Sequence, residues 1–197
     1  MAVYTRINES DLSFIEKNFN IGKVVSFAGI KKGIENTNYL IKTKNRKIIL
    51  TIFEKRVQKK DLPFFMDLMF GLSKQKIKCP EPIKNEKGKY LFKIKNKTAC
   101  LVSFLEGKDK INLTNKDCYV VGKNAALLHM AAKKLRLYRK NSLSVNSWGQ
   151  LLNKIDKRIN KLSGDLINIM KNDLSDIKKK WPKSMPDGII HSDLFID

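Results

Sequence analysis

The sequence predicts an α+β protein of two lobes, an antiparallel-sheet lobe followed by a mostly helical lobe. Three observations predict this class. Apolar residues form five short strand-like runs before residue 105, and Lys44-Asn45 joins two of these runs tightly enough for a hairpin. After residue 106, apolar residues recur at helical spacing. The chain of 197 residues is 42% hydrophobic and 9% aromatic, a composition typical of a globular protein.

The first lobe is predicted to begin with a short helix, because Asn8 and Asp11 have the spacing of a capping box. A second helix is expected from about Asp61, with Pro63 in its first turn. Cys79-Pro80-Glu81-Pro82 predicts an extended connector after it. The five strands are expected at 23–30, 36–43, 46–53, 90–94 and 98–104, the last two joined by a turn at 96–97.

Three helices are expected in the second lobe. Thr114 and Asp117 form a capping box for the first, Ser147 can cap the second, and the third begins near Asp165. With the strands upstream, this order is that of a bilobal protein-kinase-like fold. The predicted lobes are residues 1–105 and 106–197, with the helical lobe incomplete.

The segment His191-Ser192-Asp193 is the strongest functional signal, because it follows a strand-like 188–190 run as kinase catalytic loops do. Asp193 is the predicted catalytic base, which accepts the proton of a substrate hydroxyl. His191 would orient Asp193 and the backbone. A metal-binding Asn normally follows such an Asp by about five residues, so metal ligands are expected beyond Asp197. The alternative is a chance match of three residues, which the upstream element order disfavours.

A glycine-bearing loop is predicted between the first two strands. Gly29 and Gly33 bracket it, and such a loop can approach nucleotide phosphates closely through backbone N–H groups. The motif G-x-G-x-x-G is absent, so an ordinary hairpin is the alternative. Asn36 and Asn38 would either pin the loop by side-chain-to-backbone bonds or contact phosphate.

The third strand carries Thr51 where kinase-like folds place a phosphate-binding lysine. Either a nearby cation replaces that lysine, or metal and backbone hold the phosphates. Val102, Ser103, Phe104 and Leu105 join the two lobes and are the expected hinge that binds adenine. His129 is predicted to be a packed, hydrogen-bonded helix histidine without a catalytic role.

The formal net charge is +21, so nucleic acid is one class of partner to consider. Lysine is nevertheless in excess throughout, without an arginine-rich stripe, which indicates a solvated surface and no specific nucleic-acid site. Cys79, Cys100 and Cys118 are widely spaced and predict neither a disulfide framework nor a zinc site. Free thiols, no apolar leader and no run of membrane-spanning length predict a cytoplasmic protein.

Several segments together resemble bacterial homoserine kinases of the aminoglycoside-phosphotransferase-like type. They are Met1-Ala2-Val3-Tyr4-Thr5, Gly33-Ile34-Glu35-Asn36-Thr37-Asn38-Tyr39-Leu40, residues 49–57, Asp61-Leu62-Pro63-Phe64-Phe65, residues 79–82 and His191-Ser192-Asp193-Leu194-Phe195. This resemblance spans the whole chain, and a threonine at position 51 belongs to that family's own pattern.

The resemblance implies ATP- and Mg²⁺-dependent phosphorylation of L-homoserine in threonine biosynthesis. It assigns Asp193 as the base, residues 29–38 to the phosphates and residues 102–105 to adenine. Because the metal ligands are expected beyond Asp197, these 197 residues alone are expected to be inactive. The alternatives are a related kinase for choline, methylthioribose or an aminoglycoside, and a basic, non-catalytic binding protein. Oligomeric state and homoserine-binding residues stay open.

Overall fold

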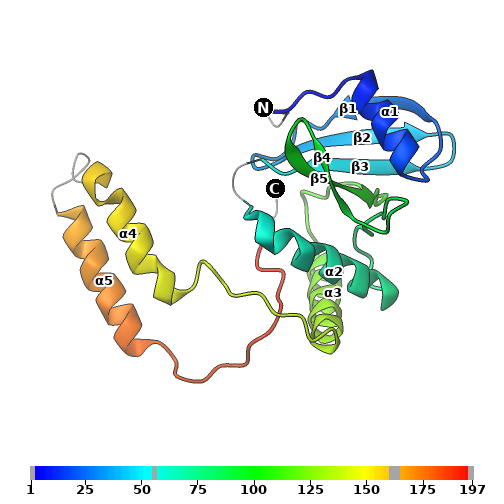
Figure 1. Cartoon of the computed structure of the whole chain (residues 1–197). Helices are drawn as coiled ribbons and strands as arrows, with labels where there is room; N and C mark the ends of the chain where they lie inside the picture. The colour runs from blue at the N-terminus through cyan, green and yellow to red at the C-terminus, as the bar shows by residue number, and fades with distance from the viewer. Residues whose placement is uncertain (1–2, 55–56, 160–164, 195–197) are drawn as a thin grey trace. The chain divides into compact units, whose positions relative to one another are not determined.

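The computed structural model describes residues 3–54, 57–159 and 165–194, without the side chains of residues 156–159. The chain divides into two compact units (Figure 1). The first unit is Met1–Tyr138 together with Gly188–Asp197, and the second is Arg139–Asp187. The lobe boundary predicted near residues 105–110 stays a prediction.

The first unit contains a five-stranded antiparallel sheet, which confirms the predicted sheet lobe. The strand order is β1-β2-β3-β5-β4. The strands are β1 (Val24–Gly29), β2 (Thr37–Thr43), β3 (Lys47–Ile52), β4 (Leu91–Ile94) and β5 (Lys97–Ser103). The hairpin at Lys44-Asn45 is present, since Thr43 N–H bonds to the Arg46 carbonyl at 2.9 Å. The other turn lies one residue earlier than predicted, at Lys95-Asn96, where both residues have positive φ.

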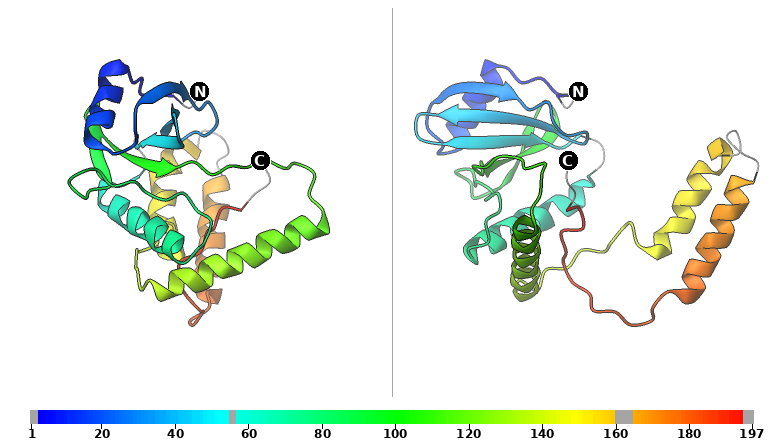
Figure 2. Two further views of the ribbon diagram at one scale, coloured as in Figure 1. Left: turned by 90° about the vertical axis from the view of Figure 1, so that its right-hand side faces the viewer. Right: turned by 180° about the vertical axis from the view of Figure 1, so that it is seen from behind.

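Helix α1 (Glu9–Asn18) covers one face of the sheet (Figures 1 and 2). Its predicted capping box is present, with Asn8 and Asp11 each accepting from the other's backbone N–H. Ile15 and Phe19 pack from this helix into the main core. The core side of the sheet is supplied by alternate strand residues, the buried side chains of Tyr39, Ile41, Ile48, Leu50, Ile52, Ile94, Ala99 and Leu101.

Helix α2 (Leu62–Lys74), preceded by a short 3₁₀ turn η1 (Lys59–Asp61), packs on the opposite face of the sheet. Its Met66 contacts the cluster formed by Cys100 and Val102 of β5. Helix α3 (Asn115–Lys134) then packs on α2 through Ala131 and Ala132, which contact Leu72. The Thr114–Asp117 capping box of α3 is present as predicted.

The second unit is a pair of helices, α4 (Val145–Ile159) and α5 (Leu166–Lys180). Trp148 and Trp181 meet edge to face, with ring centroids 5.7 Å apart. The prediction that Ser147 caps α4 was wrong, because α4 begins at Val145 and the Ser147 hydroxyl donates to the Ser144 carbonyl at 2.7 Å. Residues 188–190 are not a strand in the part of the chain that the structure describes.

Candidate functional site

The main candidate site is a cleft of about 480 Å³ between the outer face of the sheet and α2. Six of the residues that the sequence predicted for nucleotide binding line it, namely Asn38, Thr51, Val102, Ser103, Phe104 and Leu105. The remaining lining residues are mostly apolar: Ile30, Ile49, Phe53, Phe65, Met66, Met69, Pro80 and Cys100. The cleft is therefore an apolar slot with a few polar groups, a combination typical of sites for small organic ligands.

Strand alternation explains how one strand serves both the core and the cleft. In β3, Ile48, Leu50 and Ile52 are fully buried against the α1 side. The intervening Ile49 and Thr51, with Phe53 just after the strand, line the cleft. Because successive side chains point to opposite faces of a sheet, the two sets follow directly from the period of two.

Thr51 and Asn38 form the polar element of the cleft. The Thr51 hydroxyl donates to Asn38 Oδ1 at 2.8 Å, and the two residues are direct partners across β2 and β3. This bond leaves the Asn38 amide N–H₂ group to donate to a ligand. A neutral pair, whose donor is the Asn38 amide, thus stands at the position where kinase-like folds place a lysine.

The predicted hinge at the end of β5 uses part of its own backbone within the protein. Ser103 N–H donates to the Glu81 carbonyl at 2.9 Å, and Phe104 N–H donates to the Lys47 carbonyl at 3.3 Å. The Ser103 hydroxyl in turn accepts from Glu81 N–H at 2.8 Å. These bonds fix the path of the strand end, and they engage the N–H groups of two of the residues that were predicted to bind adenine.

Three predicted site residues lie at the end of β1 or in the loop between β1 and β2 but do not line the cleft. Gly29 is the last residue of β1, and Gly33 has a φ of +97°, which favours glycine. Asn36 Oδ1 accepts from Glu54 N–H at 3.4 Å. Of the two roles expected for Asn36, the structure shows the side-chain-to-backbone bond.

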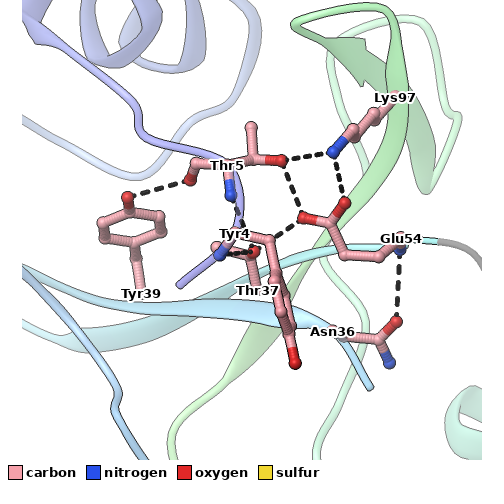
Figure 3. A network of polar contacts seen from close by, with 7 residues as sticks. All are labelled: Tyr4, Thr5, Asn36, Thr37, Tyr39, Glu54 and Lys97. Atoms are coloured by element: carbon pink, nitrogen blue, oxygen red, sulfur yellow. Dashed lines mark hydrogen bonds and ion pairs between the residues drawn. The ribbon is translucent and has the colours of Figure 1, made fainter. Parts of the chain in front are cut away.

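Beside this loop lies a polar network centred on Glu54, the second residue after β3 (Figure 3). One carboxylate oxygen accepts from the hydroxyls of Thr5 and Thr37, each at 2.7 Å, and the other pairs with the Lys97 ammonium. The Glu54 side chain is only 9% exposed. Burial raises the pKa of Glu54, but hydrogen bonds from Lys97, Thr37 and Thr5 outweigh it and hold that pKa below its ordinary value.

The predicted catalytic pair does not line this cleft and belongs to the segment Gly188–Leu194 of the first unit. His191 and Leu194 line a hollow of about 640 Å³ against α3 and residues 76–78. Asp193 is exposed, and its N–H donates to His191 Nδ1 at 3.3 Å. His191 thus contacts the backbone of Asp193, whereas Asp193 is not among the residues that line the cleft.

His129 departs from its prediction in one respect. Its Nε2 is buried in α3 and has no hydrogen-bond partner among the described residues, so this nitrogen does not make the hydrogen bond expected of His129. For the described ranges, no group of three or more His, Cys, Asp or Glu side chains could hold a metal ion. None of the helices described is both long and apolar enough to cross a membrane.

Sequence reasoning missed the apolar half of the cleft and the role of Glu54. The apolar residues could have been found from the alternation in the third strand, which marks Ile49 and Phe53 as partners of Thr51 on one face. No local signal marks Glu54, because its partners Thr5, Thr37 and Lys97 are far away in the sequence.

The sheet and the helices that follow it have the arrangement of a protein-kinase-like fold, and the comparison with known proteins gives the same result. The chain belongs to the phosphotransferase enzyme family, whose model matches residues 26–197. Homoserine kinases of Rhizobium etli and Agrobacterium fabrum are 40% and 38% identical over all 197 residues, which are 61% of each of those proteins. The chain therefore spans less than two thirds of the length of these curated relatives.

Among solved structures, a spectinomycin phosphotransferase in complex with ADP and spectinomycin has the same fold. Its TM-score is 0.64 at 15% sequence identity, over 98% of this chain and 64% of that one. The predicted α+β, protein-kinase-like fold class is thereby confirmed.

Proposed function

We propose that this chain is the nucleotide-binding and catalytic-loop part of an ATP-dependent kinase that phosphorylates L-homoserine to O-phospho-L-homoserine. The observation that carries the proposal is the single cleft that unites Asn38, Thr51 and residues 102–105 in a member of the phosphotransferase family. The substrate rests on homoserine kinases of about 40% identity. Threonine biosynthesis and a cytoplasmic location belong to the same proposal.

Adenine would lie in the apolar slot, where Ile49, Phe53 and Met66 offer flat or flexible apolar contact. Because Ser103 and Phe104 N–H groups already donate within the protein, the backbone of Leu105 is the hinge group that we assign to the base. The phosphates would extend toward the Asn38–Thr51 pair and the β1–β2 loop. Mg²⁺ enters the proposal only as the ion that accompanies ATP.

Asp193 is the proposed catalytic base. Its carboxylate would accept the proton of the homoserine hydroxyl while that oxygen attacks the γ-phosphorus and the bond to the ADP oxygen breaks. The contact between His191 Nδ1 and Asp193 N–H supports a positioning role for His191, because it restrains the backbone that carries the carboxylate.

The test is a chimaera in which residues 1–197 are joined to the part of the Rhizobium etli homoserine kinase that follows the matched region. We expect ADP release that depends on L-homoserine, measured by a coupled assay, and phospho-homoserine detected by mass spectrometry. Asp193→Asn should lower kcat by about 10²–10⁴-fold, because the general base is lost. Asp187→Asn, which changes another exposed carboxylate upstream, is the matched control and should leave kcat unchanged.

Phosphorylation of choline or spectinomycin, but not of homoserine, would contradict the proposed substrate. An Asp193→Asn chimaera with the kcat of the parent would remove Asp193 from the proposed role.

A further inference from the structure

Residues 3–5 pack against the loop between β1 and β2. Val3 packs against Gly29 so closely that a Cβ on this glycine would lie 2.8 Å from Val3 Cγ2. The Tyr4 hydroxyl donates to the Ile34 carbonyl inside the loop at 3.0 Å. Residues 3–5, here named the N-terminal strap, therefore contact both the start and the interior of the loop.

Thr37, the first residue of β2, joins the strap to the end of the same loop. Its hydroxyl oxygen accepts from Tyr4 N–H at 2.9 Å and from Thr5 N–H at 3.1 Å (Figure 3). The same hydroxyl donates its proton to Glu54. Because Thr37 is fully buried, water does not compete well for these bonds, and losing a partner would leave a polar group unsatisfied.

Glu54 is the anchor of this arrangement. A carboxylate that is almost fully buried must be paired and hydrogen-bonded to remain charged, and Lys97 with the two threonines meets that need. Lys97 also donates to the Thr5 hydroxyl at 2.7 Å, so the ammonium contacts both the carboxylate and the strap.

The anchor is also continuous with the cleft. Glu54 directly follows Phe53, which lines the cleft, and its N–H donates to Asn36 Oδ1 at the end of the loop. The network that fixes Glu54 therefore also fixes the position of the β1–β2 loop relative to β3, which lines the cleft. A loop fixed in advance binds its ligand without the entropic cost of ordering it during binding.

We propose that Glu54 is a positioning residue that, through Thr5 and Thr37, fixes the N-terminal strap on the β1–β2 loop and so presets this loop for the nucleotide phosphates. The effect on nucleotide affinity rests on the proposed function. The fixing of the loop is a property of the protein alone. Gly29 is then required for close packing against Val3, whether or not it approaches phosphate.

The test compares Glu54→Gln with Glu16→Gln in the purified chain. Glu16 is the matched control, because its carboxylate is also partly buried and accepts Val24 N–H at 2.6 Å, at the other end of β1. Amide hydrogen exchange of residues 30–37 is measured in the free protein, and the Kd for MgATP is measured by calorimetry. In Glu54→Gln we expect loop exchange to be about tenfold faster and the Kd about tenfold higher, as the loss of one charge-assisted anchor implies. Glu16→Gln should change neither.

Should Glu54→Gln fail to fold, Tyr4→Phe decides the matter, since it removes one bond from an exposed side chain. It should accelerate loop exchange and weaken MgATP binding in the same direction. Another outcome is faster loop exchange in the Glu54 and Tyr4 variants while the unaltered chain binds no MgATP. That result would support the fixing of the loop by the strap and would contradict the proposed nucleotide function. If the amide exchange rates of the loop are equal in the Glu54, Tyr4 and Glu16 variants, the proposal that Glu54 fixes the strap on the loop is wrong.

Discussion

Cys100 lines the cleft, but its burial disfavours the reactive thiolate form of its side chain. It lies on the cleft face of β5 and is 2% exposed. Burial raises the pKa of its thiol to about 12. Since only the thiolate is a good nucleophile, a thiol with this pKa remains protonated and unreactive at neutral and mildly alkaline pH.

We therefore expect iodoacetamide at pH 8 to label Cys100 in the folded chain roughly a hundredfold or more slowly than Cys118, because its thiolate fraction is so small. Cys118 is exposed on α3 and is the internal comparison. Rates are read by mass spectrometry of peptides after timed quenching. Equal labelling rates of both cysteines under native conditions would mean that the cleft opens far more often than its packing implies.

At the scale of elements, α2 and α3 differ in how their glycines are used. A Cβ on Gly71 of α2 would lie 2.7 Å from the methyl groups of Leu135, just beyond α3. A Cβ on Gly122 of α3 would meet nothing within 4 Å. The packing of Leu135 on α2 thus depends on the small residue at 71, whereas the glycine at 122 only lowers helix propensity.

Gly122→Ala should raise the free energy of unfolding by about 0.5–1 kcal/mol, the propensity difference between alanine and glycine in a helix. The free energy of unfolding of Gly71→Ala should be about 1 kcal/mol lower than that of the unaltered chain, because Leu135 must leave its packed position. Urea unfolding followed by circular dichroism measures both values. A Gly71→Ala protein as stable as Gly122→Ala would show that Leu135 moves at no cost.

For the whole molecule, the formal net charge of +21 is the dominant property. Several of its acidic groups are already engaged by lysines. Glu106 binds Lys47 at 2.6 Å and Asp117 binds Lys110 at 2.6 Å, while Asp109 contacts Lys32. The surplus positive charge therefore gives a field that attracts polyanions of any sequence.

We expect weak DNA binding that does not depend on base sequence. Its affinity should fall by at least about tenfold between 50 and 200 mM salt, because each neutralised phosphate releases counterions. Fluorescence anisotropy with two duplexes of unrelated sequence measures it. Tight binding of one duplex at physiological salt would instead favour the basic binding-protein alternative that the composition left open.

Local sequence predicted the elements well because their causes are local. The capping boxes at Asn8 and Thr114 depend on residues three positions apart, and both are present. The predicted cap at Ser147 was wrong because a serine near a helix start can donate to a preceding carbonyl and need not cap the helix. For the candidate site, Thr51 and Asn38 were predicted from their strands, and the structure places them together in the cleft.

The amino-acid sequence by itself determined the α+β class, the strand and helix positions and the polar residues of the cleft, because periodicity, capping and turn chemistry act over a few residues. Only the tertiary structure decided that Thr5, Thr37, Glu54 and Lys97 meet in one network and that Val3 covers Gly29. The physical reason is the strand order β1-β2-β3-β5-β4, which brings positions as far apart as Thr5 and Lys97 into hydrogen-bond contact. Local turn patterns specify the hairpin pairs β2–β3 and β4–β5, but they do not specify that β3 pairs with β5. They therefore cannot specify these distant partners.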